Sequence, residues 1–144
     1  MLENAWLVPL IPAVSFFVIL FFGRRLPKKG SEIGILALTA SFVISVLIAL
    51  DWIGEHVPRH PVRQHSTWFE LAGIDVGVGI HVDGLTVMML VVVSFISLMV
   101  HVYSTGYMDG DRRYTYFFAA LSLFTAAMLL LVVADNTLQL MIGW

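Results

Sequence analysis

Four long stretches without a charged residue constrain this chain more than any other feature. They cover about residues 4–22, 33–50, 84–105 and 114–134, and none contains Asp, Glu, Lys or Arg. About 20 helical residues, each rising ~1.5 Å, are needed to cross a hydrocarbon core of ~30 Å. Only 12% of the residues are charged and 59% are hydrophobic. The sequence therefore predicts an all-α polytopic membrane protein with four complete transmembrane helices.

A fifth apolar segment occupies residues 138–144 and is too short to cross a membrane. We therefore expect the chain to be the N-terminal part of a larger membrane protein. Asp135 and Asn136 lie between the fourth and fifth segments, and both residue types are favoured at a helix N-cap. This pair is predicted to cap the start of a fifth helix.

The charges near the N-terminus argue against a cleaved signal peptide and predict an orientation. Glu3 precedes the first apolar segment, whereas a signal peptide carries basic residues at that position. Six of the eight basic residues fall in the turns at 24–29 and 106–113, and two fall in the long loop 51–83. Because basic residues favour cytoplasmic loops, we expect the N-terminus and the long loop to lie outside the cell.

The long loop is predicted to contain a β-hairpin over about residues 67–82. Apolar residues alternate with polar or small residues from Ile74 to Val82, which is the period of a strand with one buried face. Gly77-Val78-Gly79 is interpreted as part of this strand, with its small residues on the exposed face. A phosphate loop is disfavoured because no strand-to-helix turn and no third glycine accompany it. Asp83 is predicted to be the N-cap of the third helix.

The sequence predicts no catalytic, cofactor-binding or metal-binding residue. His56, His60, His65 and His81 crowd the long loop, but prolines interrupt any helix that would align the first two. We interpret these histidines as solvated loop residues rather than as metal ligands. His101 is the only imidazole within a predicted span, and ionisable groups inside a membrane are functional candidates. Its place near the end of the span favours a structural role, with proton handling as the alternative.

Charge and cysteine content exclude further classes of function. The formal net charge of -2 is too balanced to indicate a nucleic-acid partner. The chain has no cysteine, which excludes disulfides and cysteine-ligated iron–sulfur clusters from it. Because the four complete spans offer only His101 as an ionisable relay group, and no nucleotide fingerprint or cluster ligand set appears, they are expected by themselves neither to carry out redox chemistry nor to conduct protons.

A set of short motifs between Asp83 and Trp144 resembles one membrane-protein family. The motifs are Asp83-Gly84-Leu85-Thr86, His101-Val102-Tyr103-Ser104, Gly106-Tyr107-Met108, Phe117-Phe118 with Leu123-Phe124, Ala134-Asp135-Asn136, and Gly143-Trp144. In this order they resemble the N-terminal part of subunit L, or chain 5, of the NADH:quinone oxidoreductase known as respiratory complex I, an antiporter-like family. The first 60 residues resemble that family only in their hydrophobic layout.

The resemblance implies a membrane subunit of a proton-translocating, electron-transport complex of the respiratory chain. Quinone reduction in other subunits would drive the transport, and those subunits would hold NADH, flavin, iron–sulfur clusters and the quinone. The relay residues of the family would follow Trp144, beginning with a glutamate, so this chain would carry none of them. The implied partners are neighbouring antiporter-like membrane subunits and the lipid bilayer. The implied location is the bacterial inner membrane, with several passes and the N-terminus outside.

The resemblance also implies a division of the chain into three parts. Residues 1–63 would hold the first two transmembrane helices and the start of the outer loop. Residues 64–129 would form the region typical of the chain 5 N-terminus, and residues 130–144 would begin the proton-conducting domain.

Two alternative functions remain open at the level of sequence. One is the large subunit of a multisubunit sodium/proton antiporter, and the other is a membrane anchor that transports nothing.

The predicted orientation is testable in this cysteine-free chain. Single cysteines introduced at Lys28 and Glu55 should react differently with a thiol reagent that cannot cross the membrane. On intact cells, position 55 should be labelled and position 28 should be protected until the cells are permeabilised. The opposite pattern would show that the basic turns lie outside.

Overall fold

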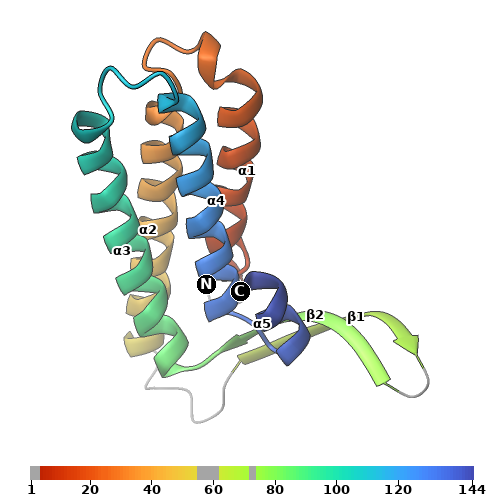
Figure 1. Cartoon of the computed structure of the whole chain (residues 1–144). Coiled ribbons are helices and arrows are strands. Elements are labelled where there is room, and N and C mark those ends of the chain that lie inside the picture. Colours follow the sequence, from red (N-terminus) through yellow and green to blue (C-terminus); the bar gives the residue numbers. More distant parts are fainter. Residues whose placement is uncertain (1–3, 55–61, 72–73) are drawn as a thin grey trace.

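The computed structural model describes residues 4–54, 62–71 and 74–144, with side chains at all of these except 62, 67–71 and 74–76. Most of the chain is helical, with one small sheet of two antiparallel strands (Figure 1). In chain order the elements are α1 (Leu7–Phe22), the 3₁₀ turn η2 (Gly23–Arg25), α2 (Ser31–Gly54), β1 (Val62–Leu71), β2 (Ile74–Val82), α3 (Gly84–Tyr107), α4 (Tyr114–Val132) and α5 (Thr137–Gly143).

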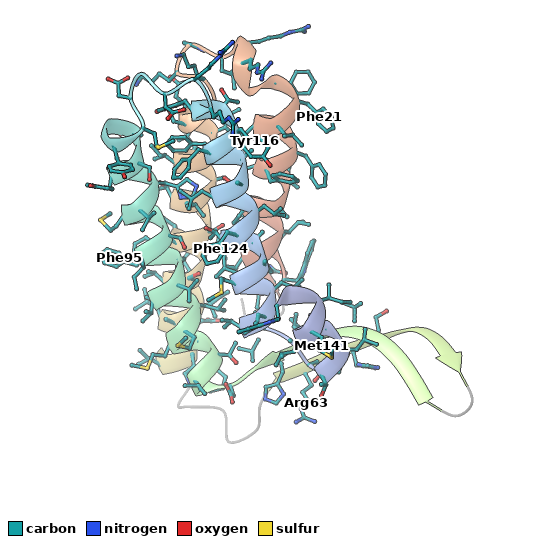
Figure 2. The ribbon with its side chains drawn as sticks, viewed as in Figure 1. Phe21, Arg63, Phe95, Tyr116, Phe124 and Met141 are labelled. Atoms are coloured by element: carbon teal, nitrogen blue, oxygen red, sulfur yellow. The ribbon has the colours of Figure 1, made fainter. Side chains whose placement is uncertain are left out.

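The four long helices form one bundle, in which α1 packs between α2 and α4 while α3 closes the other side (Figure 1). Among the described residues, four helices are long and apolar enough to cross a membrane, which confirms the four predicted spans. Large apolar side chains cover their outward faces (Figure 2). Polar groups inside the bundle bond to backbone carbonyls, as where Ser41 donates to the Val8 carbonyl at 3.2 Å. In the described part of the chain, no buried side-chain nitrogen or oxygen lacks a partner.

Several helix boundaries differ from the predicted ones by a few residues, and two of these differences have a clear local reason. The second helix starts at Ser31, slightly earlier than predicted, because Lys29 and Gly30 turn the chain with positive φ angles of 55° and 97°. Glycine adopts such angles without steric cost. The fourth helix ends at Val132 rather than at 134, because Ala134 leaves the helix and forms a bridge with strand β2.

The predicted hairpin is present and is longer than expected on its first strand. β1 pairs with β2 in antiparallel register from Val62 opposite Val82 to Leu71 opposite Ile74, with an irregularity between Thr67 and Phe69. The base of the hairpin reaches the bundle, and the far ends of the two strands extend sideways beyond α5 (Figure 1). We call this end of the bundle the hairpin end. The opposite end, with the turns at residues 23–30 and 108–113, is the turn end.

The base of the hairpin is part of the hydrophobic core. Ile80 and Val82 are buried against residues from all four long helices, including Trp52, Leu90 and Leu129. Burying an aliphatic side chain of this size contributes roughly 1.5–3 kcal/mol relative to exposure to water. An isolated hairpin has marginal stability. Packing on the bundle therefore stabilises this one.

Asp83 is the N-cap of α3, as predicted from the sequence. Its Oδ1 accepts a hydrogen bond of 2.7 Å from the backbone N–H of Thr86. This bond to Thr86 favours the ionised form and lowers the pKa of the Asp83 carboxyl below its ordinary value.

Replacing the cap should destabilise the start of α3. Asp83→Ala should lower the free energy of unfolding by about 1 kcal/mol, and Asp83→Asn, which keeps an acceptor oxygen, should lose less. Because the folded pKa is lowered, the charge-dependent part of this stability is present above the unfolded pKa of about 4 and is lost as the pH falls further. Unfolding in detergent, followed by circular dichroism, measures both effects. Equal stability of Asp83→Ala and the native chain at neutral pH would contradict the assignment.

Candidate functional site

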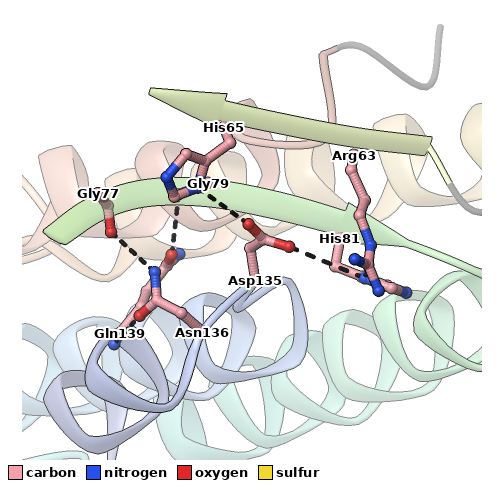
Figure 3. Close-up of polar contacts among 8 residues, drawn as sticks. All are labelled: Arg63, His65, Gly77, Gly79, His81, Asp135, Asn136 and Gln139. Carbon is pink, nitrogen blue, oxygen red and sulfur yellow. Dashed lines mark hydrogen bonds and ion pairs between the residues drawn. The ribbon is translucent and has the colours of Figure 1, made fainter. Parts of the chain in front are cut away.

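The segment between α4 and α5 lies along the edge of strand β2 at the hairpin end (Figure 3). The backbone N–H of His81 donates to the carbonyl of Val133 at 3.0 Å, and Ile80 forms an antiparallel bridge with Ala134. The chain leaving α4 therefore continues the sheet for a short distance before α5 begins. Residues far apart in the sequence meet here, and we call this contact the hairpin junction.

Two amide side chains fix α5 to the strand. Asn136 is the N-cap of α5, since its Oδ1 accepts from the Gln139 N–H at 2.8 Å, and its Nδ2 donates to the Gly77 carbonyl at 2.8 Å. The side chain of Gln139 accepts from the Gly79 N–H at 3.1 Å and is 4% exposed. Both amides thereby satisfy backbone groups that the hairpin would otherwise leave unpaired. The predicted cap is confirmed for Asn136, while Asp135 has a different role.

Gly77 and Gly79 lie on a covered face of the hairpin, which corrects the prediction of an exposed face with small residues. A Cβ atom on Gly79 would lie 2.6 Å from the Gln64 carbonyl oxygen and 2.9 Å from Asp135 Oδ2. Val78, which lies between the two glycines in the sequence, is exposed, with 53% of its surface accessible. The alternation was read correctly as a strand, but Gly79 is small because Asp135 approaches its backbone closely, and a Cβ atom on Gly77 would lie 2.6 Å from the His65 ring.

Asp135 lies between the histidines of the two strands. Its Oδ2 lies 3.1 Å from His65 Nδ1, and its Oδ1 lies 3.9 Å from His81 Nδ1. Arg63 donates from Nε to the same His81 nitrogen at 3.0 Å, so that nitrogen is an acceptor and the ring holds its proton on Nε2. At 3.9 Å, the contact of His81 with Asp135 is too long for a hydrogen bond. The Arg63 guanidinium supplies the positive charge beside it.

The hairpin junction does not have the geometry of a metal site. Across residues 4–54, 62–71 and 74–144, no group of three or more His, Asp or Glu side chains is placed to hold a metal ion. At the junction itself, Arg63 occupies the His81 nitrogen that faces Asp135. The structure describes two of the four histidines of the long loop. His65 and His81 contact the junction, and His56 and His60 lie outside the described residues.

His101 lies on the inner face of α3 and joins three helices. Its Nδ1 is 2.9 Å from the Ser97 carbonyl, which only accepts, so this nitrogen carries the proton. Its Nε2 then accepts from the Ser122 hydroxyl of α4 at 3.3 Å. The ring also meets Phe118 edge-on and lies against Gly34 of α2, where a Cβ atom would come within 3.1 Å. These contacts fit the structural interpretation, and a proton-handling role stays a prediction.

Sequence reasoning did not place Gln139 or Arg63 in the hairpin junction. Gln139 is the single uncharged polar side chain in the apolar run 138–144, and its isolation there is a signal that an internal partner exists. Arg63 gave no such signal, because a lone arginine in a polar loop is ordinary. Its role depends on the strand register, which places it opposite His81.

Comparison with known sequences shows which proteins this chain is similar to. Residues 68–118 match the family model for the NADH-ubiquinone oxidoreductase (complex I) chain 5 N-terminus. The chain is 44% identical to F(420)H(2) dehydrogenase subunit L of Methanosarcina mazei over 99% of its length. It is 37% identical to NADH-quinone oxidoreductase subunit L of Mycobacterium tuberculosis and 35% identical to that of Neisseria meningitidis, over 96% of its length in each case.

The chain is a homologue of the N-terminal region of complex I chain 5 and subunit L. This confirms the resemblance drawn from the motifs after Asp83. It also extends that resemblance, because the alignments include the first 60 residues, which matched only in hydrophobic layout. The chain spans 20% of the Methanosarcina mazei subunit, 22% of the Mycobacterium tuberculosis subunit and 21% of the Neisseria meningitidis subunit.

The close approach at Gly79 in this subunit L homologue is open to a direct test. Gly79→Ala should lower the free energy of unfolding by roughly 1–3 kcal/mol, because the new methyl group overlaps backbone and the Asp135 carboxylate. Gly106→Ala is the matched control, since a Cβ there meets nothing within 4 Å. That substitution in a helix should be neutral or stabilising. Unfolding curves in detergent that do not separate the two variants would contradict the junction geometry.

Proposed function

We propose that this chain is the N-terminal part of a membrane subunit in a proton-translocating quinone oxidoreductase. The observation that carries the proposal is the alignment of nearly the whole chain with subunit L sequences at 35–44% identity. Two of these relatives are named for NADH and quinone, and one for F(420)H(2). The proposal therefore concerns the shared membrane part, and other subunits would receive the electrons and hold NADH, flavin, iron–sulfur clusters and quinone.

Within such a complex, we assign these four helices a scaffolding role. Proton transfer across ~30 Å of hydrocarbon needs a series of ionisable groups or ordered waters. In the described spans His101 is the only imidazole, and both of its ring nitrogens have partners. The hairpin junction would fix the position of the first turn of α5. A scaffold of this kind would hold that helix, and whatever follows it in the relatives, against the bundle.

The proposed setting is a bacterial or archaeal cell membrane, crossed several times. Large exposed apolar side chains, among them Phe95, Phe124 and Met141, project from α3, α4 and α5 (Figure 2). Such a surface suits lipid or the apolar helices of neighbouring membrane subunits, which are the proposed partners. The orientation with the N-terminus outside follows from the basic residues and belongs to the same proposal.

A graft into a relative tests this function. The aligned segment of subunit L in Neisseria meningitidis is replaced by this chain, with the rest of that subunit left intact. The hybrid should join a complex that oxidises NADH with quinone and acidifies inverted membrane vesicles, because the helix packing and the junction are retained. Comigration of the tagged subunit and dye-reported acidification are the measurements.

The same graft made from the Mycobacterium tuberculosis subunit is the control. If the control assembles and acidifies vesicles while this chain does not assemble, the proposed membership is wrong. If this chain assembles and NADH oxidation proceeds without acidification, the scaffolding role in proton transport is wrong. Failed assembly and failed acidification therefore give different results in these measurements.

A further inference from the structure

A groove of about 1020 Å³ lies at the turn end, between the two turns of the bundle. Its polar lining carries the cationic side chains of Arg24, Lys29, Arg112 and Arg113 and one carboxylate, that of Asp111. Four positive charges against one negative charge make the groove strongly cationic. None of these residues belongs to the hairpin junction, which lies at the other end of the bundle.

Specific packing holds the two basic turns together. The Thr115 hydroxyl at the start of α4 donates to the Lys29 carbonyl at 2.9 Å. Gly23 packs so closely on Thr115 that a Cβ atom there would lie 2.5 Å from its methyl group. These contacts bring Arg24 and Lys29 beside the arginines that precede α4. Like charges held close together repel each other, and a bound anion relieves that repulsion.

The cations of the groove have no ion-pair partner among the side chains that the structure describes. Within the described part of the chain, no ion pair involves the side chains of Arg24, Lys29, Arg112 or Arg113. Asp111 is already engaged, since its Oδ1 accepts from the Arg113 backbone N–H at 2.7 Å. α4 begins here without a side-chain cap, so the positive end of its helix dipole adds to the field.

The other wall of the groove is apolar and continues onto the spans. Leu20 and Phe21 of α1 and Tyr116 of α4 line it, and Phe21 is 71% exposed. Figure 2 shows Phe21 and Tyr116 toward the turn end of their helices. A ligand in this groove would meet cations at the membrane surface and apolar side chains along the hydrocarbon. A phospholipid has this division of polar head and apolar chain.

A neighbouring groove of about 840 Å³ shows that the charge excess is specific to the first one. It is lined by Lys28, Lys29, Glu32 and Asp109, so its charges balance. Lys28 there lies 4.0 Å from the Glu32 carboxylate. An anion entering the turn end is therefore attracted to the first groove rather than to the second.

We propose that the groove between the two basic turns binds an anionic phospholipid. Its phosphodiester would lie among Arg24, Lys29, Arg112 and Arg113, and one acyl chain would lie against Phe21. Guanidinium and ammonium groups are the side chains best suited to a phosphate. The proposal depends only on the bundle spanning a membrane, and it holds for either orientation.

Native mass spectrometry of the purified chain released from nanodiscs tests the site. The nanodiscs contain phosphatidylglycerol and phosphatidylcholine in equal amounts. The native chain should retain phosphatidylglycerol preferentially, and Arg24→Gln with Arg113→Gln should reduce that preference more than tenfold, since each substitution removes charge-assisted hydrogen bonds to the phosphodiester. The matched control, Arg25→Gln with Lys28→Gln, removes the same number of charges from the turn end but leaves the residues that line the groove intact, and it should retain most of the preference.

Further measurements distinguish a bound lipid from the other molecules that could occupy the groove. Equal loss in both double variants, with helix content unchanged, would show general surface attraction and overturn the site. Displacement of the lipid by millimolar inorganic phosphate would show that the groove selects a free anion and would also overturn it. A photo-crosslinking residue at Tyr116 in whole membranes should yield lipid adducts. Crosslinks to protein alone would show that an acidic partner segment covers the groove, which contradicts the proposal.

Discussion

The contact between strand β2 and the segment that follows α4 is the constraint on which the hairpin end depends. In one short stretch it pairs the strand edge, caps α5 and brings Asp135 to the histidines of the hairpin. The approach of Asp135 needs Gly79, because a Cβ atom there would lie 2.9 Å from Asp135 Oδ2. The apolar side chains of the same strand, Ile80 and Val82, are buried on the bundle. One strand therefore joins the membrane helices to the start of α5.

The spans, the hairpin and the cap Asp83 were predictable because each follows from a local rule. Apolar length predicts a span, a period of two predicts a strand, and an aspartate before an apolar helix predicts a cap. The hairpin junction was not predictable in the same way, since it joins residues about 60 positions apart. The sequence shows that Gly79 is small, but only the fold shows that Asp135 and Gln139 approach it.

Polar groups inside the bundle follow a different rule from those at its ends. Within the spans, hydroxyls and the His101 ring bond to backbone carbonyls or to each other, which joins helices without placing a charge in hydrocarbon. His101 was singled out from the sequence as an ionisable group, and its contacts with Ser97 and Ser122 show how a neutral tautomer is accommodated there. A buried ring of this kind specifies the relative rotation of α3 and α4.

The two ends of the bundle differ in how their charges are balanced. At the hairpin end, Asp135 meets His65 and the guanidinium of Arg63 lies nearby, so the described groups compensate each other within the chain. At the turn end, the Thr115 contact holds basic side chains together in the cationic groove with a single carboxylate among them. A fold that gathers like charges through specific packing, next to a wall of exposed apolar side chains, provides the attraction for a molecule from outside. In a membrane, the anion available in the largest amount at that depth is a lipid headgroup.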